Sequence, residues 1–135
     1  MTVLLVDAAN VVGARPDGWW RDRAGATERL LGRLAVAGPE LVAPDGGRVT
    51  DVVAVVEGQA RDVRAPEGVR LVRAEGSGDD AVVVCAAELD GQGTPVVVVT
   101  ADRGLRARLP AGTAVTGPGW LLERLDEAAE GSGTT

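Results

Sequence analysis

Acidic residues recur just after the apolar segments of this sequence, in positions suited to metal-dependent chemistry. The five residues concerned are Asp7, Glu57, Asp79, Asp80 and Asp102. If the apolar segments are parallel strands, their carboxyl ends meet at one edge of a sheet, where α/β proteins bind ligands. Neighbouring carboxylates raise one another's pKa unless a cation offsets their charge. Mg²⁺ accepts such oxygen ligands together with substrate phosphate, and ions of this kind can activate water for phosphodiester hydrolysis.

The composition excludes several other catalytic routes. The 135-residue chain has no histidine, and all 14 of its basic residues are arginine. Catalysis would therefore use carboxylates, hydroxyls, arginine or a metal, because imidazole bases and lysine nucleophiles are absent. The formal charge of −6 argues against a broadly basic surface for nucleic acid. A phosphate substrate stays open, because bound cations can reverse the field locally.

The length fits one domain with a single core, and the one cysteine, Cys85, excludes intrachain disulfides. No apolar run approaches the roughly 20 residues that cross a bilayer. The chain enters its first apolar segment without the basic stretch of a secretory signal. We therefore expect a cytoplasmic protein with no membrane partner.

The elements that must position the acids alternate between strands and helices. Strands are predicted at 3–6, 49–56, 68–74 and 94–100, with a weaker one within 112–117. Helices are predicted from a Thr27 cap to Gly38 and over 77–91, 101–110 and 118–131, whereas 8–25 is predicted to be a long loop. Strands that are apolar throughout are typical of a parallel sheet covered on both faces. The predicted fold is a three-layer α/β/α sandwich with a central, mainly parallel sheet.

Each acid also has a purely structural interpretation. Asp79, Asp80 and Asp102 could cap the helices that they open, and Glu57 could be an ordinary surface acid beside a glycine. Asp7 is harder to explain in this way, because no helix is predicted directly after it, although an Asx turn remains open. The interpretation as a site therefore depends on the whole set.

Three segments resemble the NYN branch of the PIN-like nucleases, which includes the bacterial YacP-like proteins. They are LLVDAANVVG, GSGDDAVV and VVVVTADRGLRARL, in this order over roughly residues 2–125. The family pattern has a strand ending in Asp with Asn three residues on, an Asp opening a central helix, and Ser/Thr-x-Asp after a later strand. The resemblance implies a single PIN-like (NYN) domain over residues 1–130, followed by a flexible tail at 131–135.

The resemblance also implies a metal-dependent ribonuclease that uses Mg²⁺ or Mn²⁺ and takes RNA as its substrate. Asp7, Asp79 and Asp102 would be the catalytic, metal-binding residues, with Asp80 as an auxiliary metal ligand. Asn10 would orient Asp7 or contact the scissile phosphate. The supporting residues would be Thr100, which would position Asp102 or a water, and Glu57, which lies near the place of a further acid in related nucleases.

Substrate contacts are predicted from residues near these acids. Arg103 is the favoured phosphate ligand, because it adjoins Asp102 and a guanidinium chelates phosphate oxygens in bidentate fashion. Trp20, or its neighbour Trp19, could stack on an unpaired base, although a loop tryptophan more often pins the loop to the body. Other arginines near the acids could reach RNA or could instead pair with surplus carboxylates: Arg15, Arg21, Arg23 and Arg106.

Other functions stay open at this level. The acidic charge favours a catalytically idle PIN-like module that binds RNA or protein. A Toprim-like phosphotransfer enzyme fits poorly, because VVEG offers a glutamate but the later Asp-x-Asp is missing. The sequence does not choose between a toxin and an RNA-processing enzyme, and a homodimer or a protein partner remains open.

Overall fold

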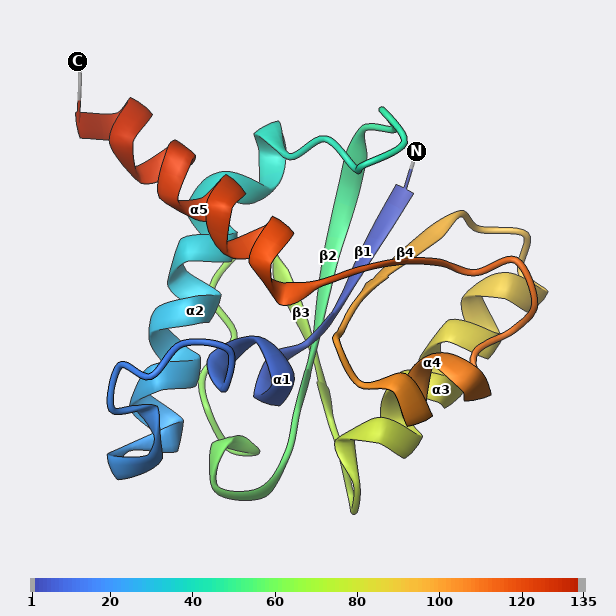
Figure 1. Ribbon diagram of the computed structural model, residues 1–135, viewed down its shortest axis with the longest axis horizontal. Coiled ribbons are helices and arrows are strands. Elements are labelled where there is room, and N and C mark those ends of the chain that lie inside the picture. The colour runs from blue at the N-terminus through green and yellow to red at the C-terminus, as the bar shows by residue number, and fades with distance from the viewer. Residues whose placement is uncertain (1, 134–135) are drawn as a thin grey trace.

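The fold is a parallel sheet between two helical layers (Figure 1). The computed structural model describes residues 2–133, and side chains for residues 2–130. The strands follow the order β3-β2-β1-β4-β5, and each hydrogen-bonded pair is parallel. The three-layer α/β/α prediction is confirmed. In chain order the elements are β1 (Thr2–Asp7), α1 (Ala8–Val12), η1 (Trp19–Arg21), α2 (Arg23–Ala37), η2 (Gly38–Glu40), β2 (Val49–Val56), η3 (Gly58–Ala60), β3 (Val69–Arg73), α3 (Gly78–Gly91), β4 (Val96–Val99), α4 (Arg103–Arg108), β5 (Ala114–Thr116) and α5 (Pro118–Gly133).

The central strand β1 is buried along its whole length. Its Leu4 and Val6 belong to the core that also contains residues of α1, α2 and α5, and its Val3 and Leu5 belong to the core formed with α3 and α4. Because both faces of the strand are covered, every position needs an apolar residue. The exceptions are the two end residues, Thr2 and Asp7, and Asp7 lies at the carboxyl end of the strand.

The strand order has a topological switch point between β1 and β4. The strands β2 and β3 extend it on one side of β1, and β4 and β5 extend it on the other. In open α/β sheets the ligand-binding crevice lies at such a point, outside the carboxyl ends of the strands. Asp7 at the end of β1 and Thr100 just after β4 lie at this point.

Residues 8–25 do not form the predicted long loop. The helix α1 begins at Ala8, directly after Asp7, and η1 holds the two adjacent tryptophans. The expectation that no helix follows Asp7 was therefore wrong. Asp7 occupies the N-cap position of α1, but its side chain makes no capping hydrogen bond. A five-residue helix is too short to produce a recognisable period in the sequence.

Asp22, and not Thr27, caps α2. The Asp22 carboxylate accepts a hydrogen bond from the Gly25 N–H at 2.9 Å. Thr27 lies one turn inside the helix, where it is buried and its hydroxyl donates to the carbonyl oxygen of Arg23. Gly38 and Pro39 end the helix as predicted, since α2 stops at Ala37 and a 3-10 turn follows.

Substituting Asp22→Ala is expected to lower the free energy of unfolding by about 1 kcal/mol, because the variant leaves an N-terminal backbone N–H of α2 without its acceptor. Urea denaturation followed by circular dichroism measures the change. Asp17→Ala, at an exposed acid of the preceding loop, is the control and should stay within about 0.5 kcal/mol of the parent. Equal stability of the two variants would contradict the cap assignment.

The last helix is longer than predicted. Its backbone continues to Gly133, three residues into the segment 131–135 expected to be a tail, and Thr134 and Thr135 lie outside the described residues. Over the part of the chain that the structure describes, no helix combines the length and apolarity that crossing a bilayer needs.

Candidate functional site

A buried hydrogen-bond chain joins the ends of β1 and β4. The Thr100 hydroxyl donates to Asp7 Oδ2 at 3.0 Å and accepts from the Asp102 N–H at 3.2 Å. Thr100 is fully buried and Asp7 is 3% exposed. Thr100 therefore holds the Asp7 side chain and the Asp102 backbone at the same time.

Asn10 adds a second link across the same crevice. Its Oδ1 accepts a hydrogen bond from the Ala101 N–H at 2.8 Å. The residue lies on α1, and the three-residue spacing from Asp7 places the two residues on one side of the helix start. The Asn10 side chain thus ties α1 to the loop between β4 and α4.

Burial raises the pKa of Asp7 from 3.8 to about 6. Loss of hydration is the largest cause, and the Thr100 hydroxyl opposes it by stabilising the carboxylate. The negative charges of Asp79 and Glu57 raise the pKa further. The crevice therefore carries negative charge from several strands, and a cation bound there would stabilise the ionised form of Asp7.

The first turn of α3 brings Asp79 to this edge of the sheet. Ser77 caps the helix, because its hydroxyl accepts from the N–H groups of Asp79 and Asp80 at 3.1 and 3.4 Å. Capping therefore belongs to Ser77 and not to the two aspartates. Burial, followed by the charges of Asp102 and Glu57, raises the pKa of Asp79.

Glu57 reaches the same helix start from the end of β2. Its Oε2 accepts a hydrogen bond from the Gly78 N–H at 2.6 Å. A Cβ atom at position 78 would lie 2.7 Å from Glu57 Cδ, so the close approach depends on glycine. Glu57 therefore lies with Asp7, Asp79, Asp80 and Asp102 at this edge of the sheet, as its place after a strand suggested. We call this group of five residues the acidic edge.

The remaining acids have protein partners. Asp102 caps α4 by accepting from the Leu105 N–H at 3.0 Å, as its structural interpretation proposed. Asp80 is exposed and forms an ion pair with Arg108 at 2.6 Å. Both contacts occupy oxygens that the resemblance assigns to a metal.

The acidic edge has donor atoms that suit a divalent ion, but these atoms are not arranged as a preformed metal site. Within residues 2–130, no three acidic or cysteine side chains are arranged to hold an ion. The donors are all carboxylate oxygens, which Mg²⁺ and Mn²⁺ accept, and burial, together with the charges of neighbouring acids, raises the pKa values of Asp7 and Asp79. Glu57, Asp80 and Asp102 each contact a protein group through one carboxylate oxygen, so an ion would bind the other oxygen or replace that contact.

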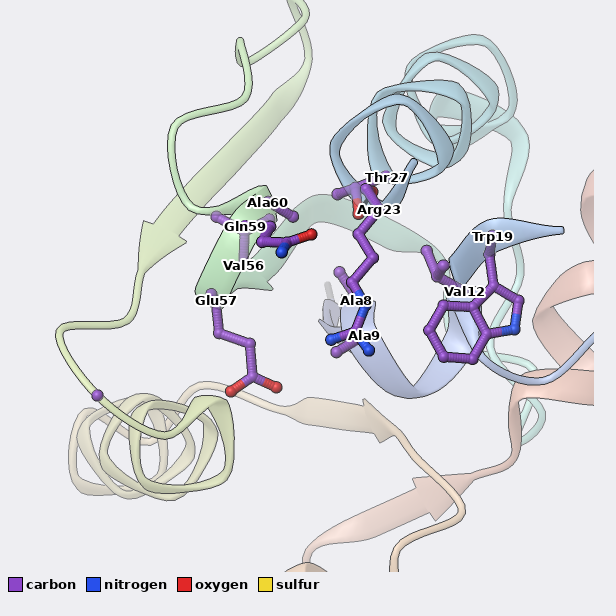
Figure 2. A pocket seen from close by; sticks show the side chains of 12 residues that line it. Ala8, Ala9, Val12, Trp19, Arg23, Thr27, Val56, Glu57, Gln59 and Ala60 are labelled. Atoms are coloured by element: carbon purple, nitrogen blue, oxygen red, sulfur yellow. Dashed lines mark hydrogen bonds between the residues drawn. The ribbon is translucent and has the colours of Figure 1, made fainter. Parts of the chain in front are cut away.

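A pocket of about 330 Å³ adjoins the acidic edge, with lining residues from α1, η1, α2 and η3 (Figure 2). Trp19, Arg23 and Gln59 line it, and it shares Glu57 with the acidic edge. The guanidinium carbon of Arg23 lies 5.3 Å from the centroid of the Trp19 ring.

The sequence assigned the aromatic contact to Trp20, which is 51% exposed and packs edge-to-face against Trp19. Gln59 was not predicted from the sequence, and the available signal was its position two residues after Glu57, just beyond the end of a strand.

The arginines divide between free and paired positions. Arg103 is exposed at the start of α4, and no ion pair involving it occurs among the described side chains. Arg15 instead pairs with Asp126 of α5 at 2.9 Å, which lowers the pKa of Asp126 to about 2. The pairing interpretation therefore holds for Arg15, whereas Arg103 keeps its guanidinium available.

Comparison with known proteins identifies the fold. Two crystal structures of Rae1 (YacP) from Bacillus subtilis superpose on this chain. One gives a TM-score of 0.71 at 21% identity, covering 96% of this chain and 76% of the other. The W164L mutant gives 0.70 at 21% identity, covering 96% and 78%. No family model matches the chain, and no curated protein matches its sequence significantly. The likeness establishes the fold, in agreement with the YacP-like resemblance of the motifs.

Proposed function

We propose that this protein is a ribonuclease that hydrolyses RNA phosphodiester bonds with the help of Mg²⁺ or Mn²⁺. The observation that carries the proposal is the environment of Asp7, a buried carboxylate in the crevice whose pKa is raised to about 6 by burial and by neighbouring acids. A perturbed carboxylate in a cleft is typical of a functional site. The fold shared with YacP structures supports the same conclusion.

In this proposal Asp7, Asp79 and Asp102 hold the ion, with Asp80 as an auxiliary ligand and Glu57 as a supporting acid. A bound divalent ion supplies Lewis acidity toward water and phosphate. Thr100 and Asn10 fix the crevice by the hydrogen bonds to Asp7 and to the Ala101 N–H. Arg103 binds the phosphate backbone. Attack by water leaves a 5′-phosphate and a 3′-hydroxyl.

The proposal predicts that the purified protein cleaves single-stranded RNA in Mn²⁺ and stops when EDTA is added. Asp79→Asn should reduce the rate by at least about a hundredfold, because loss of a group that orients a metal already costs 10- to 100-fold. Cleavage of a labelled RNA, resolved on a denaturing gel, measures the rate.

The matched control is Asp90→Asn, at the other end of α3, which should cleave as fast as the parent. Cleavage that persists in EDTA, or that survives Asp79→Asn, would overturn the proposed function. A product carrying a 2′,3′-cyclic phosphate would exclude direct attack by water.

A second candidate is a catalytically idle module that binds RNA or protein. It is favoured by the contacts that engage Glu57, Asp80 and Asp102 with protein groups. Isothermal titration with Mn²⁺ separates the two candidates. The ribonuclease requires a site that is lost in Asp7→Asn, whereas an idle module shows no such site.

A further inference from the structure

We infer that the pocket beside the acidic edge is a subsite for one unpaired base of the RNA, an inference that rests on the proposed function for the identity of the polymer. The pocket and the acidic edge share Glu57, so a base bound there would lie next to the reacting phosphate. Its volume of about 330 Å³ is at the lower end of the range for small-molecule sites, which suits a single base.

The lining of the pocket matches the chemistry of a base. Apolar side chains from β2, α1 and η3 form much of the wall: Ala8, Ala9, Val12, Val56 and Ala60. The Gln59 amide supplies both a donor and an acceptor, which is what the edge of a base requires. Figure 2 shows the Gln59 side chain extending from η3 toward the side chain of Arg23, which comes from α2.

Arg23 provides a flat surface in this pocket. Its side chain extends from α2 toward Ala8 and Ala9, between Glu57 and Trp19 (Figure 2). The Trp19 ring lies next to the guanidinium, whose carbon is 5.3 Å from the ring centroid, and no ion pair to Arg23 occurs among the described side chains. Guanidinium planes stack on bases as aromatic rings do. A base bound between Arg23 and Gln59 would therefore stack on the guanidinium plane.

The positive charge of Arg23 has a second effect. The acidic edge repels the phosphate backbone, and Arg23 is a cation at the border of that edge with no carboxylate partner among the described residues. A pocket that needed only this charge would bind phosphate without a base. Arg23→Lys separates the two roles, because lysine keeps the charge and lacks the plane.

The test is an NMR titration in EDTA, where the RNA is not cleaved, that follows the indole N–H signals of the three tryptophans and the Gln59 side-chain amide. The probes are the four nucleoside 5′-monophosphates and ribose 5-phosphate, which lacks the base. Nucleotides should shift the Trp19 and Gln59 signals saturably and bind at least about fivefold more tightly than ribose 5-phosphate, since base stacking contributes on the order of 1–3 kcal/mol. Arg23→Lys and Gln59→Ala should each reduce that difference, while Arg21→Lys, the matched control on η1, should retain it.

A short single-stranded RNA should shift the same two signals with higher affinity than a mononucleotide. Equal binding of ribose 5-phosphate and nucleotides, an unchanged preference in Arg23→Lys, or binding of mononucleotides but not RNA would each overturn the inference. The outcome is independent of catalysis. If the protein cleaves RNA with Mn²⁺ but does not discriminate between nucleotides and ribose 5-phosphate, the subsite alone is contradicted. If it discriminates between them but does not cleave RNA, the proposed function alone is contradicted.

Discussion

Replacing Asp7 with asparagine is expected to stabilise the folded protein at pH 8 by on the order of 3 kcal/mol in EDTA, while it abolishes RNA cleavage. The pKa of Asp7 rises from 3.8 to about 6 on folding, so the ionised side chain costs free energy in the native state. Each unit of pKa corresponds to about 1.4 kcal/mol. Asparagine removes the charge and keeps an oxygen that can accept from the Thr100 hydroxyl, so the buried hydrogen bond survives.

The stabilisation should depend on pH in one direction. Because the folded state binds the Asp7 proton more tightly than the unfolded state, the cost is fully present above about pH 6. It falls as the pH drops from about 6 to 3.8 and disappears below 3.8, where both states are protonated. Urea denaturation of parent and variant at pH 8, 6 and 4 measures the gap, which should shrink steadily toward pH 4. A gap of the same size at pH 4 and pH 8, or a variant less stable than the parent at pH 8, would contradict the burial of a charged Asp7.

The same substitution tests whether the cost serves a function. A protein that retains a destabilising buried acid gains activity or binding from it, which is a common trade-off at functional sites. Mn²⁺ should therefore raise the melting temperature of the parent and leave that of Asp7→Asn unchanged, because only the parent offers the ionised ligand. Asp90→Asn is the control and should respond to Mn²⁺ as the parent does.

The sheet and the crevice could be predicted because strong local signals agreed with the tertiary structure. The Val-rich runs of β1, β2 and β4 are apolar at nearly every position, which only a sheet covered on both faces explains. Once those strands are parallel, Asp7, Glu57 and Asp102 must follow their carboxyl ends at one edge. The residue types and their spacing were sufficient for this step.

The sequence did not predict which of two similar neighbouring residues caps a helix or lines the pocket. Ser77 and Asp79 are both good caps, and only the geometry of the α3 start decides that Ser77 accepts the backbone N–H groups. Trp19 and Trp20 are adjacent and identical in type. The 3-10 helix that directs Trp19 into the pocket depends on the packing around that helix. For the same reason, the sequence did not reveal that a backbone N–H engages Glu57, and it offered the capping role of Asp102 only as one of two interpretations.

Thr100→Val is expected to destabilise the protein at pH 8 by about 2–4 kcal/mol, although valine matches threonine in shape. The substitution deprives two groups of their partner at once: Asp7 Oδ2 loses its donor and the Asp102 N–H loses its acceptor. Each buried polar group left unsatisfied costs about 1–3 kcal/mol. The site is fully enclosed at Thr100, so water cannot replace the hydroxyl without repacking.

The substitution should also move the pH dependence of activity. The Thr100 hydroxyl lowers the pKa of Asp7, so its removal raises that pKa above about 6 and shifts the acidic limb of the cleavage rate to higher pH. Thr100→Ser keeps the hydroxyl and should retain the parent profile, with a smaller loss of stability from the missing methyl group. Rate measurements from pH 5 to 9 on both variants decide the role of Thr100. A parent-like acidic limb in Thr100→Val would mean that Asp7 does not titrate in the reaction, whereas a shift confined to the valine variant would link the buried hydroxyl to the reacting carboxylate.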